Sequence, residues 1–212
     1  MKKKILSVAL IVALLAIMVG GSLAYFTAED KVTNTFTIGS VDIEIVEEFT
    51  TPETMIPVAS VDENDPNYVT KEARVKNIGA NAAYVQMYVA IPEALDEVGA
   101  FVVVDANTGD WTTRAAAGTV TFGEVEYNVY RYCYNKELAS KAETTNVITA
   151  AYLAPQLDYQ NGKFVMNGTV IENYTPGTSI EIYVAAQAIQ AQGFDGYVQA
   201  LENFTTHPWT TN

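Results

Sequence analysis

The 212-residue sequence predicts an all-β fold, an antiparallel β-sandwich with a few short helical insertions. Three observations favour this class. Hydrophobic residues alternate with polar ones along most of the chain, which is the period of half-buried strands. Asn-Gly, Pro-Gly and related dipeptides separate the alternating segments and are typical of turns. Hydrophobic residues make up 49% of the chain and charged residues only 17%, so the chain can bury one sizeable core.

The first 24 residues have the three-part layout of a secretory signal peptide. Three lysines at positions 2–4 form a positive region, residues 5–19 are apolar throughout, and small residues precede position 25. We therefore expect a signal peptidase to cleave between Ala24 and Tyr25. Cleavage removes three lysines and no acidic residue, so it changes the formal net charge from −13 to −16. The alternative is a membrane anchor, but this apolar run is shorter than the roughly 20 residues that span a bilayer. No stable membrane span is expected after cleavage.

The first strands of the mature chain are interrupted by a change of phase. Val32, Phe36 and Ile38 share one face of an extended segment, and the alternation then slips at Gly39 before it resumes over residues 41–46. An extra residue in a strand turns the following side chains to the opposite face, and glycine is common at such joints. The pattern divides the chain into a signal peptide (1–24), an N-terminal segment (25–39) with a hinge at Gly39, and a sandwich domain (40–212).

Residues 68–76 and 83–91 alternate in the same way and flank a polar stretch, residues 77–81. This arrangement predicts a hairpin-like pair of strands joined by a turn. Residues 92–97 follow as a short helix, with proline in the first turn and acidic residues near its N-terminus.

The rest of the chain continues the alternation. Short helices are predicted at residues 135–143 and 195–204, the second with Asp195 as its cap. Further strands are predicted at residues 101–105, 119–122, 125–134, 147–153, 163–171 and 179–188.

The composition restricts which partners, metal ions and catalytic sites the chain can have. The acidic balance argues against nucleic acid as a partner, because phosphate binding needs clustered Lys and Arg. The chain has one His (His207) and one Cys (Cys133), and no zincin, nucleophile-elbow or phosphate-loop motif occurs. No catalytic, cofactor-binding or metal-binding residue is assigned, and an enzyme is not expected. Cys133 is interpreted as a small buried residue of a strand, with a reactive thiol as the alternative.

One loop, residues 62–67, is rich in oxygen-bearing side chains. Calcium prefers such ligands, so weak calcium binding at Asp62 and Asp65 is a hypothesis. The alternative is a solvated turn. No other cofactor is expected.

Two parts of the sequence resemble the TasA/camelysin family of secreted Gram-positive proteins. The first is the leader together with residues 24–30 and 35–43. The second is residues 75–79, followed by Ala83, Tyr84 and Val85, which are similar to that family's K-N-x-G and A-Y-V pattern. A weaker similarity covers residues 182–201. The resemblance implies a jelly-roll β-sandwich, release by a dedicated signal peptidase, and assembly into fibres of the extracellular biofilm matrix or cell surface.

In fibres of this family, the N-terminal segment of one subunit adds as a strand to the next. The residues of this chain fit that role, since residues 25–38 alternate with period two and precede a glycine. Phe26, Val32, Phe36 and Ile38 are the expected groove-filling side chains, and copies of the same chain are the expected partners. Whether another protein starts the fibre stays open. The alternatives are an ordinary first strand, a camelysin-like cell-surface metalloendopeptidase, and a monomeric adhesin or carbohydrate-binding module.

Overall fold

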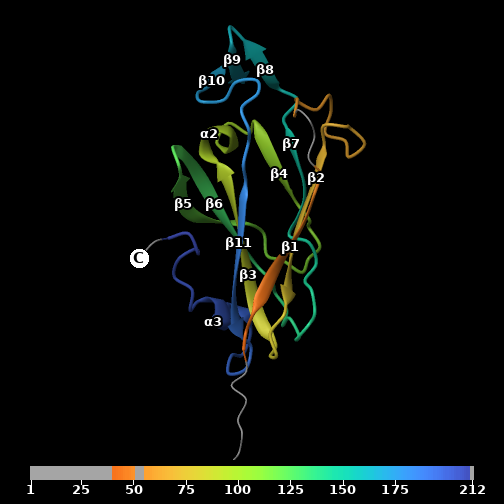
Figure 1. The fold of residues 1–212 in the computed structure, drawn as a ribbon, viewed down its shortest axis with the longest axis vertical. Helices are drawn as coiled ribbons and strands as arrows, with labels where there is room; N and C mark the ends of the chain where they lie inside the picture. The colour runs from red at the N-terminus through yellow and green to blue at the C-terminus, as the bar shows by residue number, and fades with distance from the viewer. Residues whose placement is uncertain (1–39, 51–54, 211–212) are drawn as a thin grey trace, which may run out of the picture. The chain divides into compact units, whose positions relative to one another are not determined.

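The computed structural model describes residues 40–50 and 55–210, all of which belong to one compact unit. Two four-stranded antiparallel sheets face each other (Figure 1). Sheet A has the strand order β1-β2-β7-β4, and sheet B has the order β11-β3-β6-β5. A third, three-stranded sheet has the order β10-β9-β8 and lies at the top of the view in Figure 1. The predicted all-β class is confirmed.

The elements have the following bounds. Sheet A contains β1 (Ile43–Phe49), β2 (Val69–Asn77), β7 (Ile148–Leu153) and β4 (Phe101–Asp105). Sheet B contains β11 (Tyr183–Gln190), β3 (Ala83–Pro92), β6 (Val125–Cys133) and β5 (Ala115–Phe122). The small sheet contains β8 (Leu157–Gln160), β9 (Lys163–Met166) and β10 (Thr169–Ile171). Two short helices are α2 (Glu93–Asp96) and α3 (Tyr197–Leu201), and no helix in residues 40–50 and 55–210 is long and apolar enough to cross a membrane.

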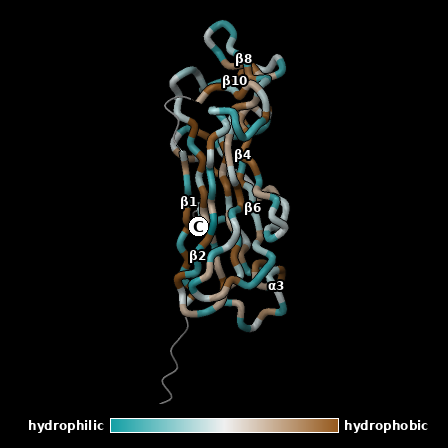
Figure 2. The backbone as a smooth tube through the Cα atoms, turned by 90° about the vertical axis from the view of Figure 1, so that its right-hand side faces the viewer, coloured by the Kyte–Doolittle hydropathy of each residue, from teal (hydrophilic) through white to brown (hydrophobic). Residues whose placement is uncertain are grey.

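The core lies between the inward faces of the two large sheets. Val75 of β2 and Val85, Met87 and Val89 of β3 are completely buried there. Hydrophobic segments recur along the strands in Figure 2, as the alternating sequence requires. The repeated crossing of the chain between the sheets fits a jelly-roll-like sandwich.

The predicted hairpin of residues 68–76 with 83–91 is wrong. Strand β2 lies in sheet A and β3 in sheet B, so the chain crosses from one sheet to the other between them. The crossover is organised by Asn77, which is completely buried. Its Nδ2 donates to the carbonyl oxygens of Asn81 at 2.8 Å and Leu138 at 3.1 Å. Alternation predicts which face of a strand is buried, but it does not distinguish a neighbour in the sheet from a strand across the core.

Residues 135–143 form an irregular segment with isolated β-bridges and a turn at residues 140–141, not a helix. Their backbone groups complete the ends of the central strands: Leu138 and Ala83 exchange hydrogen bonds of 2.8 and 3.0 Å, and Ala142 accepts one from Asn77. These tertiary hydrogen bonds override a local helical preference.

Several other predicted boundaries also differ. Residues 163–171 form two strands, because Asn167 and Gly168 adopt positive φ angles of 50° and 85° and turn the chain. Strand β8 was not predicted. The last helix begins at Tyr197, after Gly196 rather than after a cap at Asp195.

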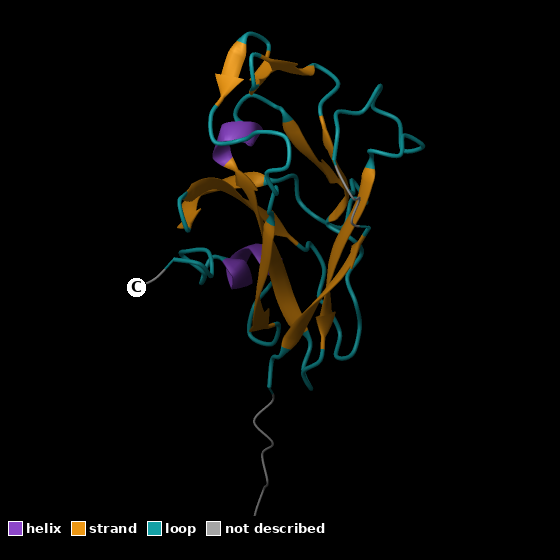
Figure 3. Cartoon of the chain, turned by 45° about the horizontal axis from the view of Figure 1, so that its top comes forward, coloured by secondary structure: helices purple, strands orange, loops and turns teal. Residues whose placement is uncertain are grey.

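The outer face of sheet B is covered by α3 and the C-terminal segment (Figure 3). The Trp209 ring packs edge-on against Tyr88, with centroids 6.5 Å apart, and against Phe122 at 5.8 Å. His207 is buried beside Tyr88 in the same cluster. Apolar side chains therefore pack against both faces of sheet B.

Candidate functional site

The residues predicted to form the donor strand lie outside the described part of the chain. This applies to the cleavage pair Ala24 and Tyr25, to the groove-filling residues Phe26, Val32, Phe36 and Ile38, and to the hinge Gly39. These assignments stay predictions. The structure does describe the sheet edges and grooves that residues 40–50 and 55–210 offer to an added strand.

One side of the sandwich is incompletely covered. Edge strands β1 of sheet A and β11 of sheet B face each other there (Figure 1). Their inward side chains pack against the core but remain partly exposed, whereas those of the central strands are fully buried. The partly exposed set is Val41, Ile43 and Ile45 on one side and Ile180, Ile182, Val184, Ala186 and Ala188 on the other. An additional apolar strand along this side would bury them.

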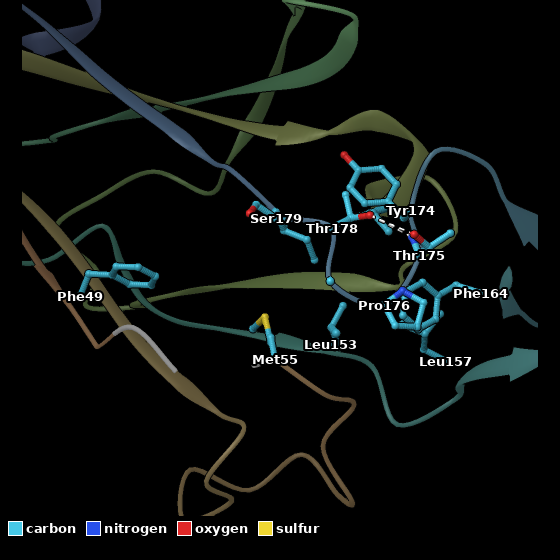
Figure 4. Close-up of a pocket in the computed structure, with 13 residues that line it drawn as sticks. Phe49, Met55, Leu153, Leu157, Phe164, Tyr174, Thr175, Pro176, Thr178 and Ser179 are labelled. Atoms are coloured by element: carbon cyan, nitrogen blue, oxygen red, sulfur yellow. Dashed lines mark hydrogen bonds between the residues drawn. The ribbon is translucent and has the colours of Figure 1, made fainter. Parts of the chain in front are cut away.

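A cavity of about 390 Å³ opens at one end of this side (Figure 4). Phe49 and Met55 line one wall, and Thr175–Ile180, just before β11, lines the other. The side chains of Leu95, Leu153, Leu157 and Phe164 also line the cavity. We call this cavity and the half-covered strip beside it the β1/β11 groove. The lining residues carry no charge, so the groove suits apolar side chains and main-chain groups.

The far wall of the groove is a defined turn. The Thr178 amide donates to the Thr175 carbonyl at 2.9 Å, and the Thr175 amide donates to Thr178 Oγ1 at 3.1 Å. Gly177 allows this turn through a φ of +91°. Burial raises the pKa of the adjacent Tyr174 to about 12, so its hydroxyl stays neutral at physiological pH.

The opposite side of the sandwich, between β4 and β5, has a different character. Asp96 of α2 accepts hydrogen bonds from Tyr130 at 2.6 Å and from Asn128 at 2.8 Å. Tyr132 donates to Asp105 at 2.7 Å, and the Arg114 guanidinium lies 4.8 Å from the centre of the Tyr130 ring. Burial and the Asp96 hydrogen bond raise the pKa of Tyr130 to about 12. This side is already linked by polar contacts, and an apolar strand would have to displace them.

The crossover loop, residues 77–82, contacts the backbone just before β1. The amides of Ile78 and Gly79 both donate to the Asp42 carbonyl at 2.9 Å, and the Ala80 amide donates to the Ser40 carbonyl at 3.1 Å. A Cβ atom on Gly79 would lie 2.4 Å from the Ser40 oxygen and 2.8 Å from the Asp42 nitrogen. The crossover loop thus holds the first described residues of the chain.

Asp62 and Asp65, the residues considered as calcium ligands, lie in one loop, and calcium binding there stays a prediction. Asp62 and Asp65 cap turns: Asp62 accepts the Asn64 amide at 2.9 Å, and Asp65 accepts those of Asn67 at 2.8 Å and Ala59 at 2.9 Å. These backbone hydrogen bonds lower the pKa of both carboxyl groups. Within the described residues, no three His, Cys, Asp or Glu side chains are grouped as a metal ion requires.

His207 and Cys133 are the single histidine and the single cysteine of the chain, and neither belongs to a group of possible metal ligands within the described residues. The His207 ring nitrogens lie 3.3 and 3.4 Å from Thr210 Oγ1, between Tyr88 and Trp209. Cys133 is half-buried in β6, and burial raises the pKa of its thiol. A protonated thiol is a poor nucleophile and a poor metal ligand, so the geometry favours a packing role for Cys133.

Residues 1–91 match the family described as camelysin metallo-endopeptidase. The match extends from the leader through β1 and β2 into β3, so it includes the crossover loop. It confirms the resemblance to the TasA/camelysin family over these residues. No curated protein matches the chain.

Proposed function

We propose that this chain is a secreted structural subunit that polymerises into fibres of the extracellular or biofilm matrix. Residues 25–39 of one copy would occupy the β1/β11 groove of the next as a donor strand. The observation that carries the proposal is the half-covered row of apolar side chains on β1 and β11, next to an uncharged cavity. Edge strands with free backbone groups and apolar pockets accept a strand by β-augmentation.

The chemistry of the N-terminal segment complements this groove. Phe26, Val32, Phe36 and Ile38 supply apolar side chains, while the intervening threonines suit the solvent side of an added strand. Residues 25–39 reach about 50 Å when extended, which is enough to follow an edge strand of the sandwich. The β4/β5 side is the less suitable acceptor because Asp96, Tyr130 and Asp105 already link it.

The direction of the chain supports an open polymer. The N-terminal segment joins the sandwich at Ser40, just before β1, whereas the cavity lies beside Phe49, at the end of β1. Phe49 lies nine residues after Ser40, or about 30 Å along an extended chain. The donor segment therefore leaves at one end of β1, and the cavity of the β1/β11 groove opens at the other. A contact between unlike surfaces joins the copies head to tail and generates a filament when the rotation between copies does not close a ring.

The experiment compares four proteins by electron microscopy and light scattering after removal of the leader. Wild-type protein should form fibres, and a protein that starts at Gly39 should form none. Phe49→Asp places a charge in the groove and should also abolish fibres. Val198→Asp is the matched control, because Val198 is 56% exposed on α3 and Phe49 is 57% exposed.

Mixing the two defective proteins gives the sharpest result. The protein that starts at Gly39 keeps the groove, and Phe49→Asp keeps the donor segment, so together they should form pairs of one copy each and no fibres. Normal fibres from the shortened protein would refute the mechanism. A monomer at every concentration, with saturable glycan binding, would support the adhesin alternative instead.

The name of the matching family makes a metalloendopeptidase the second candidate. The described residues do not fit the metal that such an enzyme needs, since their possible ligands do not gather and His207 lies in an aromatic cluster. We therefore derive no metal-dependent step. Zinc analysis of the purified protein and a chelator-sensitive casein assay test this candidate, and two positive results would revive it.

A further inference from the structure

We propose that the crossover loop is a clamp that fixes the point and the direction in which the N-terminal segment leaves the sandwich. This inference rests on the proposed function, because the segment that it positions is the proposed donor strand. The clamp consists of the loop amides of Ile78, Gly79 and Ala80, with Gly79 as its critical residue. It holds the backbone of residues 40–42.

Hydrogen bonds from the crossover loop hold the backbone just before β1. In the paired part of the sheet, β1 and β2 are in register from Ile43 opposite Asn77 to Phe49 opposite Lys71. Beyond that ladder, the chain is held by three loop amides, two of which converge on the Asp42 carbonyl. Contacts of this kind restrict the backbone more closely than a frayed strand end would.

Gly79 lies very close to the backbone of residues 40–42. Its φ is not in the left-handed region, so the backbone conformation itself does not require glycine. What requires glycine is space, because a Cβ atom would lie 2.4 and 2.8 Å from backbone atoms of Ser40 and Asp42. Backbone atoms of a strand cannot yield as the end of a flexible side chain can. Alanine at position 79 should therefore push residues 40–42 away.

The crossover loop is itself held by further hydrogen bonds. The Gly79 amide also donates to Asn77 Oδ1 at 2.9 Å, and the Gly79 carbonyl accepts the Ser140 hydroxyl at 2.7 Å. Lys141 donates its amide to the Asn77 carbonyl at 2.9 Å. The loop is thus held by Asn77, at the end of β2, and by residues 140–141. A fixed loop can set the course of a segment that it touches, whereas a mobile loop cannot.

The consequence concerns assembly. A donor strand must leave its own subunit in one direction if each copy is to meet the next in the same orientation. Holding the exit point also lowers the entropy that is lost when the segment enters a neighbouring groove. The clamp would therefore make the fibre regular and its growth efficient.

The test uses the secreted protein with spin labels on Ser40→Cys and Glu137→Cys, in a Cys133→Ser background. Both labelled residues are exposed. The unmodified loop should give a narrow distribution of distances between the labels. Gly79→Ala should broaden it, and the amides of Ile78 and Ala80 should exchange hydrogen about tenfold faster, as expected for the loss of one or two hydrogen bonds. Fibres of Gly79→Ala should be shorter or irregular.

Two further variants make the result specific. Gly196→Ala is the matched control, since a Cβ atom there meets nothing within 4 Å, and it should behave as the wild type does. Ser140→Ala removes one support of the loop without adding an atom, so it gives a smaller broadening and keeps the test valid if Gly79→Ala does not fold.

Three outcomes decide the matter. A narrow distribution in both Gly79→Ala and Ser140→Ala overturns the clamp. A broad distribution with fibres of normal length and regularity also overturns it, because the clamp would then have no role in assembly. If the wild-type protein forms no fibres, the proposed function fails, while the label distances still report whether the loop holds residues 40–42.

Discussion

The Tyr130 hydroxyl donates a 2.6 Å hydrogen bond to Oδ2 of Asp96, and this contact ties sheet B to helix α2. The same carboxylate accepts a second hydrogen bond, from Asn128. This pair lies on the β4/β5 side of the sandwich, whereas the neighbouring Leu95 of α2 lines the cavity of the β1/β11 groove. One side of the molecule is thus linked by polar side chains, while the other exposes apolar ones.

Asp96→Ala should destabilise the sandwich. The substitution leaves the partly buried Tyr130 hydroxyl and Asn128 amide without their acceptor, and such losses cost about 1–3 kcal/mol of unfolding free energy. Urea unfolding of the protein measures the change. Asp195→Ala is the control, because it removes the same charge from an exposed position. Equal stability of the two variants would show that the Asp96 contacts contribute nothing.

The free energy of unfolding should fall between about pH 10 and 12. The pKa values of Tyr130, Tyr174 and Tyr183 are each raised from 10.0 to about 12, the first two mainly by burial and the third mainly by the Glu181 hydrogen bond. A pKa that is raised in the folded state contributes stability that is complete below the unfolded pKa and is lost as pH rises through the folded value. Urea unfolding at several alkaline pH values measures this loss.

Absorbance at 295 nm gives an independent check of the same titration. In the folded protein, Tyr130, Tyr174 and Tyr183 should ionise near pH 12. In Asp96→Ala, the Tyr130 contribution should move to lower pH, because the Asp96 hydrogen bond and charge add to the burial that raises that pKa. A single step near pH 10 for all 13 tyrosines of the folded protein would contradict the assignment.

A synthetic peptide of residues 25–39 should bind a protein that starts at Gly39 and raise its Tm. Binding to the folded state alone adds about 2.7 kcal/mol of stability at a peptide concentration of about 100 Kd. Differential scanning calorimetry measures the shift. A peptide with Phe36→Asp and Ile38→Asp is the control, and it should leave the Tm unchanged. If both peptides act equally, the groove does not recognise the predicted side chains.

The sequence predicts the strands well where one face of each is buried. The central strands β2, β3, β6 and β7 were predicted to within a few residues, because their alternation reflects the core that they share. Their partners could not be predicted in the same way. Asn77 shows why: its polar character predicted a turn, whereas its buried side chain supports a crossover between sheets.

Only the donor's side of the candidate site could be proposed from the sequence. Phe26, Val32, Phe36 and Ile38 form a local pattern of neighbouring positions, and their donor role stays a prediction. The groove has no such pattern, because Phe49, Leu153, Phe164 and Ile180 come from distant segments that only the fold brings together. The one local signal was the Pro176-Gly177 turn, which forms part of the far wall. Its role depends on β1, more than 100 residues earlier in the chain.

Salt should promote bundling of the fibres and leave the growth of single fibres nearly unchanged. The chain carries a formal net charge of −13, or −16 without the leader, so neighbouring fibres repel each other. Raising the ionic strength from about 0.1 M to 1 M shortens the screening length from about 10 Å to 3 Å and weakens this repulsion. The β1/β11 groove has no charged lining residue, so the donor contact has little electrostatic repulsion to lose.

Electron microscopy of fibre width, with light scattering for the rate of growth, separates the effect of salt on bundling from its effect on the growth of single fibres. Fibre width that does not change with salt would show that charge does not keep the fibres apart, and faster growth in step with bundling would place charged groups in the donor contact itself.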